Sequence, residues 1–269
     1  MKVSFRTGGS RRAAGSSRHW SELRSARWGV RLATLAVFLG AWQWAGDDSL
    51  ALLFPTFTRT LETFIGLVAD GSLPLALLIT NQTLVAGFGL AVVLGVTIGV
   101  CSARVPLVDR VVAPYFNLLV AVPIIALVPV VQALMGLSFQ ARMTIVALFA
   151  LPYIVINSAV AVRRVDPALV EMARSFGAGR FTVLREVVLP AAVPGIMTGV
   201  RIGLGQALIG MVVAELTIVG AGVGSLIVEM QGRFRVAPVL AVAITVVLQG
   251  VILITLAEWL ERRLSRWRS

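Results

Sequence analysis

Long apolar segments separated by short polar connections dominate the pattern of this chain. Each segment is close to or longer than the roughly 20 residues that a helix needs to cross the hydrocarbon core of a bilayer. They cover residues 28–45, 75–101, 111–135, 143–162, 190–219 and 237–260. The pattern therefore predicts an all-α polytopic membrane protein, with six transmembrane helices in a domain over residues 28–269 and a polar arm over residues 1–27.

A shorter helical pattern lies between the first two predicted spans. Leu61, Phe64, Ile65 and Val68 recur at helical spacing within residues 58–69, and the charged side chains lie outside this stripe. The segment is too short and too charged to cross a bilayer. We expect a helix that lies at the outer membrane interface.

Three prolines interrupt the third predicted span, at Pro114, Pro123 and Pro129. A proline removes a helical hydrogen bond and clashes with the preceding turn. We therefore expect a kinked or broken helix over residues 111–135, with its freed carbonyls satisfied by protein or by a cavity.

The polar connection over residues 163–189 interrupts the apolar pattern for longest. Asp166 can cap a helix whose first residue is Pro167, and Gly177 is a natural left-handed terminator. A second amphipathic segment over residues 181–188 leads to Pro190 and the fifth span. These features indicate two short helices joined at residues 177–179, which form either a docking platform for a partner or an ordinary solvated connection.

The composition supports a membrane protein, with 58% hydrophobic and only 14% charged residues. The formal net charge is +11, but the arginines lie between apolar segments and at both ends rather than on one soluble patch, so we expect no nucleic-acid partner. The arm, the connections after spans two and four, and the tail are basic. Positive charge collects on the cytoplasmic side, which predicts that both termini are cytoplasmic, although Arg233 and Arg235 lie on the outer side.

Several kinds of chemistry are excluded or disfavoured by residue type. The chain has one cysteine, Cys101, and one histidine, His19, too few for an ordinary zinc site, and no carboxylate cluster suggests another metal. Cys101 is expected to be a small buried residue. Lys2 is the only lysine, so a Walker A loop for ATP is absent. We find no catalytic cluster and do not expect an enzyme.

Two ionisable residues fall inside the fifth predicted span. Arg201 and Glu215 are 14 residues apart, which brings them to within about 40° on a helix but separates them by about 21 Å along its axis. Leu204, Leu208 and Val212 lie on nearly the same stripe. Ionisable residues inside a membrane favour a functional role, here a stripe that lines a transport pathway. The alternative is that each one bonds a neighbouring helix or backbone, or extends to the interface.

The connection over residues 163–189 resembles the Glu-Ala-Ala loop of binding-protein-dependent ABC importer permeases. The family pattern is Glu-Ala-Ala, three residues, Gly, nine residues, Ile, one residue, Leu-Pro. Its positions correspond here to Glu171, Met172, Ala173, Gly177, Val187, Leu189 and Pro190. The spacing is kept, while Met172 replaces the first Ala and Val187 the Ile. In this family the loop inserts into a groove of the ATP-binding subunit and transmits its motion.

Other segments resemble one branch of that family, the nitrate, sulfonate and taurine type. They are Asp70-Gly71-Ser72-Leu73, residues 122–129, 165–169 and 198–202, and Gly222-Val223-Gly224-Ser225-Leu226-Ile227. The branch often has Ser-Leu-x-Arg before the second span, where this chain has Thr80-Asn81-Gln82-Thr83. This difference leaves the transported solute open.

The resemblance implies a type I importer permease of the MetI-like kind, with a coupling loop between spans four and five. Such a chain would pair with a second copy, two ATP-binding subunits and a solute-binding protein, and would act in a bacterial inner membrane. ATP and magnesium would be used by the partner, so the chain itself would bind no cofactor. A self-sufficient secondary transporter is the alternative, but such folds often show repeated halves with buried acids, and we see no repeat.

Overall fold

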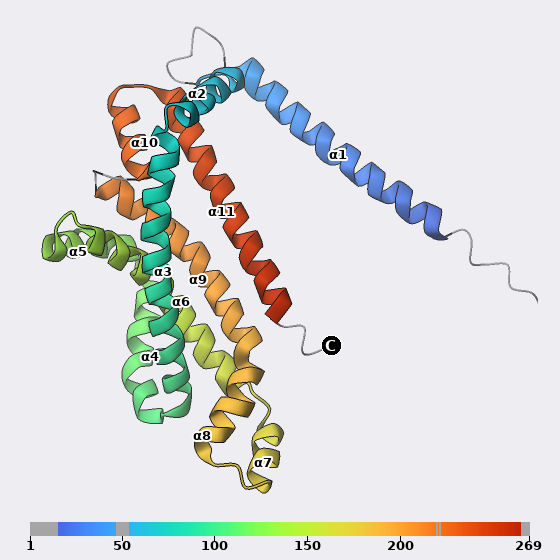
Figure 1. Ribbon diagram of the computed structural model, residues 1–269, viewed down its shortest axis with the longest axis vertical. Coiled ribbons are helices and arrows are strands. Elements are labelled where there is room, and N and C mark those ends of the chain that lie inside the picture. The colour runs from blue at the N-terminus through green and yellow to red at the C-terminus, as the bar shows by residue number, and fades with distance from the viewer. Residues whose placement is uncertain (1–15, 47–53, 219, 221, 265–269) are drawn as a thin grey trace, which may run out of the picture. The chain divides into compact units, whose positions relative to one another are not determined.

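The computed structural model describes residues 16–46, 54–218, 220 and 222–264, which form helices joined by turns and short loops (Figure 1). Contacts divide the chain into two units, Met1–Leu61 and Glu62–Ser269, and each is described by itself.

The first unit contains helix α1, Ser16–Ala45, and the first residues of α2, Phe57–Ala69. The indole Nε1 of Trp42 donates to the carbonyl of Pro55 at 3.1 Å, and its ring packs edge-on against Phe57. Gln43 accepts from the backbone N–H of Thr58. Side chains near the end of α1 therefore hold the start of α2. The predicted span over residues 28–45 lies within α1, and residues 16–27 of the predicted arm form its beginning.

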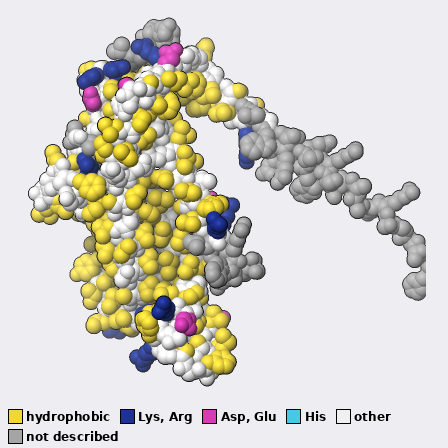
Figure 2. Space-filling model, in the orientation of Figure 1, with side chains coloured by type: hydrophobic (Ala, Val, Ile, Leu, Met, Phe, Trp, Pro, Cys, Tyr) yellow, Lys and Arg dark blue, Asp and Glu magenta, His cyan; other side chains and the backbone are white. Residues whose placement is uncertain are grey.

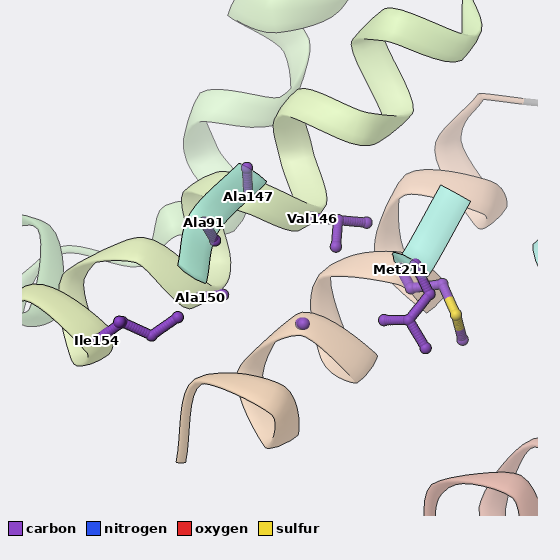
Figure 3. Packing of buried hydrophobic residues seen from close by; sticks show 8 residues of the cluster. Ala91, Val146, Ala147, Ala150, Ile154 and Met211 are labelled. Carbon is purple, nitrogen blue, oxygen red and sulfur yellow. The ribbon is translucent and has the colours of Figure 1, made fainter. Parts of the chain in front are cut away.

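Three long helices form the core of the second unit: α3, Ser72–Arg104, α6, Phe139–Arg163, and α9, Leu189–Thr217. Helix α6 packs against both α3 and α9. The cluster in Figure 3 lies between them, with Ala91 from α3, Val146 and Ile154 from α6, and Met211 from α9. Small and branched apolar side chains at these positions let the helices pack closely.

Glycines of α3 line its contact with α6. A Cβ atom placed on Gly87 would lie 2.6 Å from the carbonyl oxygen of Met143. One on Gly99 would lie 2.6 Å from the carbonyl of Val155, and one on Gly95 would meet Ile154. The four-residue spacing of these glycines thus marks a seam where only a hydrogen atom fits between the helices.

The proline-rich third span is broken, which confirms the expectation for residues 111–135. Helix α4, Pro106–Ala121, is followed by the 3₁₀ turn η2, Ile124–Leu127, and by α5, Val128–Met135. The two halves meet at 102°. Val122, which precedes Pro123, adopts an extended conformation with φ −91° and ψ 142°. A residue before proline is pushed out of the helical region, and this explains where the break falls.

Two helices after α9 and the turn between α2 and α3 complete the second unit. Helices α10, Val223–Gly232, and α11, Val236–Leu264, follow α9 and pack against it. Asp70 and Gly71, with φ +79°, join α2 to α3. The Asp70 carboxylate accepts from the hydroxyl and the backbone N–H of Ser72, and these hydrogen bonds hold the pKa of Asp70 below its usual range.

Four described helices are long and apolar enough to cross a membrane: Ser72–Arg104, Phe139–Arg163, Arg180–Thr217 and Val236–Arg263. The bent pair α4 and α5 gives a fifth if its halves count as one span. On the face drawn in Figure 2, apolar side chains cover the sides of this bundle and most charged ones gather toward its two ends. The described residues thus account for four or five of the six predicted spans, and α1 is not among them.

Candidate functional site

Helix α7, Pro167–Ser175, begins as the sequence predicts. The carboxylate of Asp166 accepts from the backbone N–H of Ala168 at 2.9 Å, and Pro167 occupies the first helical position. The carboxylate satisfies a donor that the helix cannot, and proline has no N–H there to satisfy. The start of α7 is therefore fixed by two adjacent residues.

The end of α7 is a Schellman motif. The backbone N–H of Gly177 donates to the carbonyl of Arg174 at 2.9 Å, and that of Ala178 donates to the carbonyl of Ala173 at 3.1 Å. Gly177 has φ +81°, the left-handed conformation that this motif needs and that glycine adopts without steric cost. The predicted terminator is confirmed, and the hydrogen bonds that define it span only three to five residues.

Apolar contacts fix α7 to the long helices. Ala173 and Ala178, the two residues joined by the longer bond of the motif, pack on a buried cluster. That cluster contains Val162 from α6, Val183 and Val188 from the next segment, and Ala192 from α9. Helix α7 is therefore held against the ends of two spans rather than extending freely.

The segment after α7 differs from the prediction of a separate second helix. The helical turn α8, Arg180–Thr182, the π-helical turn η3, Val183–Val188, and α9 form one continuous helix over Arg180–Thr217. The ring of Pro190 would clash with the carbonyl four residues before it in a regular α-helix. The wider π turn ends just before Pro190, so the helix widens where the proline requires room and continues.

The residues that match the family loop lie on both sides of this turn. Glu171 and Met172 are exposed on α7, whereas Ala173 is half-buried against the cluster. Val187 and Leu189 are half-buried, and Pro190 is exposed on the continuous helix. The residues that match the family loop therefore include exposed side chains on the outward surface of α7 and half-buried side chains that pack beneath it.

The loop carries apolar side chains without a cover in the described chain. Phe176 is 85% exposed and Phe181 is 73% exposed, and Met172 and Leu169 lie beside them in sequence with 55% and 37%. Figure 2 shows apolar and charged atoms together at the end of the bundle that α7 and α8 form. Two phenylalanines in such exposure on a rigidly supported turn are typical of a surface that contacts another protein.

Arg201 is bound by carboxylates from a neighbouring helix. Its guanidinium lies 3.3 Å from Glu258 and 3.2 Å from Glu261, both on α11. Thr198, one turn earlier on α9, also donates to Glu261 at 3.0 Å. The sequence shows no acid within one turn of Arg201 in the fifth span. Its partners come from the sixth span, and the pattern within a single span could not identify them.

The other predicted stripe residues face neighbouring helices. Leu204 is buried, and Leu208 and Val212 are half-buried against the apolar cluster of α3, α6 and α9. The structure does not bring Arg201 and Glu215 together. A role of this stripe in lining a pathway stays a prediction.

Glu215 is completely buried at the far end of α9. One carboxylate oxygen accepts from the hydroxyl of Thr80 on α3 and from the backbone N–H of Gly224, each at 3.0 Å. The Thr80 oxygen in turn accepts from the backbone N–H of Val223 at 3.0 Å. Glu215 and Thr80 therefore cap the first N–H groups of α10, where a negative charge is favoured by the helix dipole.

The glycines of this turn leave the space that the Glu215 side chain occupies. A Cβ atom on Gly222 would overlap Glu215, and one on Gly224 would lie 2.6 Å from the backbone carbon of Glu215. Buried Arg142, at the start of α6, adds an electrostatic attraction to the carboxylate without a direct ion pair. We call this arrangement of Thr80, Arg142, Glu215, Gly222 and Gly224 the Glu215 cluster. Sequence reasoning singled out Glu215 and the Gly-rich segment but not their contact, nor Thr80 and Arg142 as partners.

Cys101 corrects one expectation, because it is exposed on α3 rather than buried. It lies between the seam residue Gly99 and buried Ser102, on the side of α3 that faces away from α6. Among the described residues, no group of three His, Cys, Asp or Glu side chains could hold a metal ion.

The structure thus combines a bundle of apolar, membrane-spanning helices with a rigidly supported turn that exposes apolar side chains at one end. The chain belongs to the family described as binding-protein-dependent transport system inner membrane component, whose model matches residues 91–266. This confirms the resemblance to ABC importer permeases. Members of the family are transport subunits, and the chain is accordingly a permease and not an enzyme.

Relatives support the predicted branch. The SsuC permease protein of Bacillus subtilis (strain 168), whose name refers to aliphatic sulfonates, is 31% identical over 244 residues, covering 90% of this chain and 88% of its own length. The taurine transport system permease protein TauC of Escherichia coli (strain K12) is 29% identical, covering 88% and 89%. The riboflavin transport system permease protein RibX of Chloroflexus aurantiacus is 31% identical with the same coverage.

Solved structures confirm the fold. A chain of the inward-facing MetNI methionine ABC transporter aligns with a TM-score of 0.61 at 18% identity, covering 70% of this chain and 93% of that one. An amino acid ABC transporter with histidines aligns with a TM-score of 0.59 at 19% identity, covering 74% and 98%. The all-α, MetI-like fold that the sequence predicts is therefore correct.

Proposed function

We propose that two copies of this chain form the pathway through which an ABC importer moves a small solute into a bacterial cell. The solute is a small anion such as nitrate, a sulfonate or taurine, or a vitamin precursor. A periplasmic or extracellular binding protein delivers it, and two copies of a separate ATP-binding subunit drive transport. Both termini and the α7 surface face the cytoplasm in this proposal.

One observation carries the proposal. Met172, Phe176 and Phe181 are exposed on a helix end that is fixed by its own hydrogen bonds and by packing against two spans. A partner that binds this surface can move α9, because α8 and η3 continue into α9 without a break. A rigid connection of this kind suits the transmission of motion from an ATPase to the membrane.

The energy source lies outside the chain in this proposal. The only lysine is Lys2, so the chain lacks the loop that cradles ATP phosphates. ATP and magnesium would be bound by the partner subunit. Uptake that proceeds in vesicles containing this chain alone, without any ATPase, would support a self-sufficient secondary transporter instead.

Docking is tested by removing the exposed aromatic rings. Phe176→Ser and Phe181→Ser cost the isolated chain little because both rings are exposed, but they should reduce co-purification of the ATPase at least ten-fold if these rings are anchors worth about 2 kcal/mol together. Phe234→Ser is the matched control, since that ring is 81% exposed on the loop after α10. Wild-type recovery of the ATPase by both variants contradicts the docking role.

The charge of the loop gives a second test. Glu171→Lys should leave the chain inserted in the membrane but uncoupled from ATP hydrolysis, whereas Glu62→Lys, at an exposed glutamate of α2, should not. Measured quantities are uptake and ATPase stimulation in proteoliposomes, each normalised to the amount of assembled complex. Equal coupling in both variants would argue against a role of Glu171.

Stoichiometry and orientation are separate parts of the proposal. Native mass spectrometry of the complex should find two identical permease copies, and a single copy or a second, different permease would overturn the homodimer. A cysteine introduced at Ser72 should be labelled from outside intact cells and one at Ser269 should not. Labelling of position 269 from outside would reverse the orientation.

The role of Arg201 is decided by how two substitutions behave. Its ion pairs with Glu258 and Glu261 favour a structural role, in which Arg201→Gln and Arg201→Lys lower the amount of assembled complex and uptake together. A charge in the pathway predicts a different result, with uptake per assembled complex mostly lost in Arg201→Gln and partly kept in Arg201→Lys.

A further inference from the structure

A groove of about 390 Å³ lies between α7 and the adjoining ends of α3 and α6. Three arginines line it, each from the last turn of a different helix: Arg104 of α3, Arg163 of α6 and Arg174 of α7. The family resemblance assigns the outward surface of α7 to the ATPase. This groove lies toward the membrane-spanning helices, shares Glu171 with that surface, and has no assigned ligand.

The groove has a net positive charge even after the ion pair of Arg163 is taken into account. Asp109 of α4 binds Arg163. Arg104 and Arg174 have no carboxylate partner within the described residues, and Glu171 is the only acid in the lining. Two guanidinium groups without an ion-pair partner and one carboxylate therefore give the groove a net charge of about +1, which one negative charge of a ligand would neutralise.

Apolar side chains supply part of the lining, which is otherwise polar. They are Val162, Val165 and Val170, together with Ala103. A free inorganic anion would use only the guanidinium groups and gain nothing from the valines. A phospholipid has both parts, because its phosphate carries one negative charge and its glycerol and upper acyl chains are apolar.

We propose that this groove binds the headgroup of an anionic phospholipid of the adjacent leaflet, such as phosphatidylglycerol. The phosphate lies between Arg104 and Arg174, and the glycerol region lies on the valines. Basic pockets at the ends of transmembrane helices bind anionic headgroups for the same reason, since each arginine near the surface adds attraction. The site rests on the proposed orientation only for its assignment to the cytoplasmic leaflet.

The bound lipid would also stabilise the position of α7 against the long helices. Its phosphate joins α7 to the end of α3, because Arg174 and Arg104 line the groove from these two helices. Anionic lipid should therefore strengthen the coupling between ATPase and transport, whereas binding itself needs neither partner nor solute.

The native cysteine provides the measurement. Cys101 is the only cysteine of the chain, is exposed, and lies one turn before Arg104. The full-length protein, labelled there with a fluorophore and placed in phosphatidylcholine nanodiscs, is titrated with phosphatidylglycerol that carries brominated acyl chains, which quench on contact. Quenching should saturate at a mole fraction at least about five-fold lower than for brominated phosphatidylcholine.

Variants separate the groove from general surface attraction. Arg104→Gln and Arg174→Gln should each lower the preference for phosphatidylglycerol about five-fold. Arg110→Gln removes an exposed arginine of α4 outside the groove and should not change it. The two groove variants stand on different helices, so misfolding of one leaves the other informative.

Three results would overturn the proposal. Equal quenching by both lipids in the wild-type protein denies the preference. An equal loss in Arg110→Gln shows attraction to the basic surface rather than to the groove. Release of phosphatidylglycerol by an excess of inorganic phosphate, with no change in quenching by phosphatidylcholine, assigns the groove to a free anion. None of these results bears on whether the ATPase docks at Phe176 and Phe181, so the proposed function is tested independently.

Discussion

The turn after α7 and the turn before α10 both depend on a glycine with positive φ, +81° at Gly177 and +87° at Gly222. Their surroundings are opposite. Nothing lies within 4 Å of a Cβ atom on Gly177, whereas one on Gly222 would overlap the carboxylate of Glu215. The first turn is an exposed feature with a local cause, and the second is a buried one that other helices define.

The hydrogen bonds of the two turns follow the same division. Those that end α7 join residues three to five positions apart. Two of the three in the Glu215 cluster join Thr80 to residues 135 and 143 positions away, and the third joins Gly224 to Glu215, nine positions apart. The exposed turn after α7 is therefore determined by hydrogen bonds within its own segment. The buried turn before α10 is determined by contacts among α3, α9 and α10. The comparison predicts that equal substitutions have unequal effects in the two places.

The largest difference is expected between two Gly→Ala substitutions. Gly222→Ala should destabilise the protein by about 3 kcal/mol or more, since φ +87° and ψ −176° is a conformation nearly restricted to glycine and the new methyl group meets Glu215. Gly177→Ala should cost only about 1 kcal/mol, the strain of the left-handed conformation. The measurement is unfolding of the purified chain in an SDS titration.

Asparagine sharpens this contrast, because it tolerates the left-handed conformation better than alanine does. Gly177→Asn should be nearly neutral, and Gly222→Asn should be as damaging as Gly222→Ala. If both sites respond alike to either residue, the contrast between a local and a long-range turn is wrong.

The sequence was informative where the causes are local. The Asp166 cap, Pro167, the Gly177 terminator and the broken third span were all predicted, since each depends on residues within a few positions. Pairings across the fold were not. Arg201 forms ion pairs with Glu258 and Glu261, and Glu215 accepts a hydrogen bond from Thr80. The packing of the helices determines these contacts, and no short sequence pattern indicates them. The helix before Pro190 was predicted, but its continuation into the fifth span was not. Proline normally interrupts a helix, and the π turn that accommodates Pro190 leaves no mark in the amphipathic pattern.

The next effect concerns the Glu215 carboxylate itself. Glu215→Ala should destabilise the protein by about 2–3 kcal/mol, because it leaves the N–H of Gly224 and the Thr80 hydroxyl without their acceptor. Glu215→Gln keeps an acceptor oxygen and should cost about half as much. SDS titration again gives the free energy of unfolding.

A double-mutant cycle with Thr80→Val tests whether the cluster acts as a unit. If Thr80 and Glu215 support one another, the two substitutions together should cost less than the sum of the single ones by about 1 kcal/mol. Additive losses would show that Thr80 and Glu215 act on α10 independently, and the cluster would then not be one structural element.

A smaller effect is expected at the seam of α3 and α6, where close packing again involves distant residues. Gly87→Ala should cost about 1–3 kcal/mol, because the methyl group meets the Met143 carbonyl and Val146. Gly89→Ala, two residues along the same helix with nothing within 4 Å, should be neutral or slightly stabilising through helix propensity. A similar loss at both positions would mean that α3 needs flexibility rather than close contact.

The smallest effect is expected at the start of α7, where the cause is local and the surface is exposed. Asp166→Ala removes the acceptor for the Ala168 N–H and should weaken the first turn of α7 by about 1 kcal/mol, while Asp166→Asn keeps an acceptor and should weaken it less. Global unfolding should hardly change, because α7 adds little to the buried core of the long helices. Hydrogen exchange by mass spectrometry should instead show exchange about five-fold faster in a peptide over residues 167–175, with the segments of α3 and α6 unaffected. Faster exchange throughout the second unit would show that α7 supports the bundle, and would remove the distinction between a locally built surface and a jointly built core.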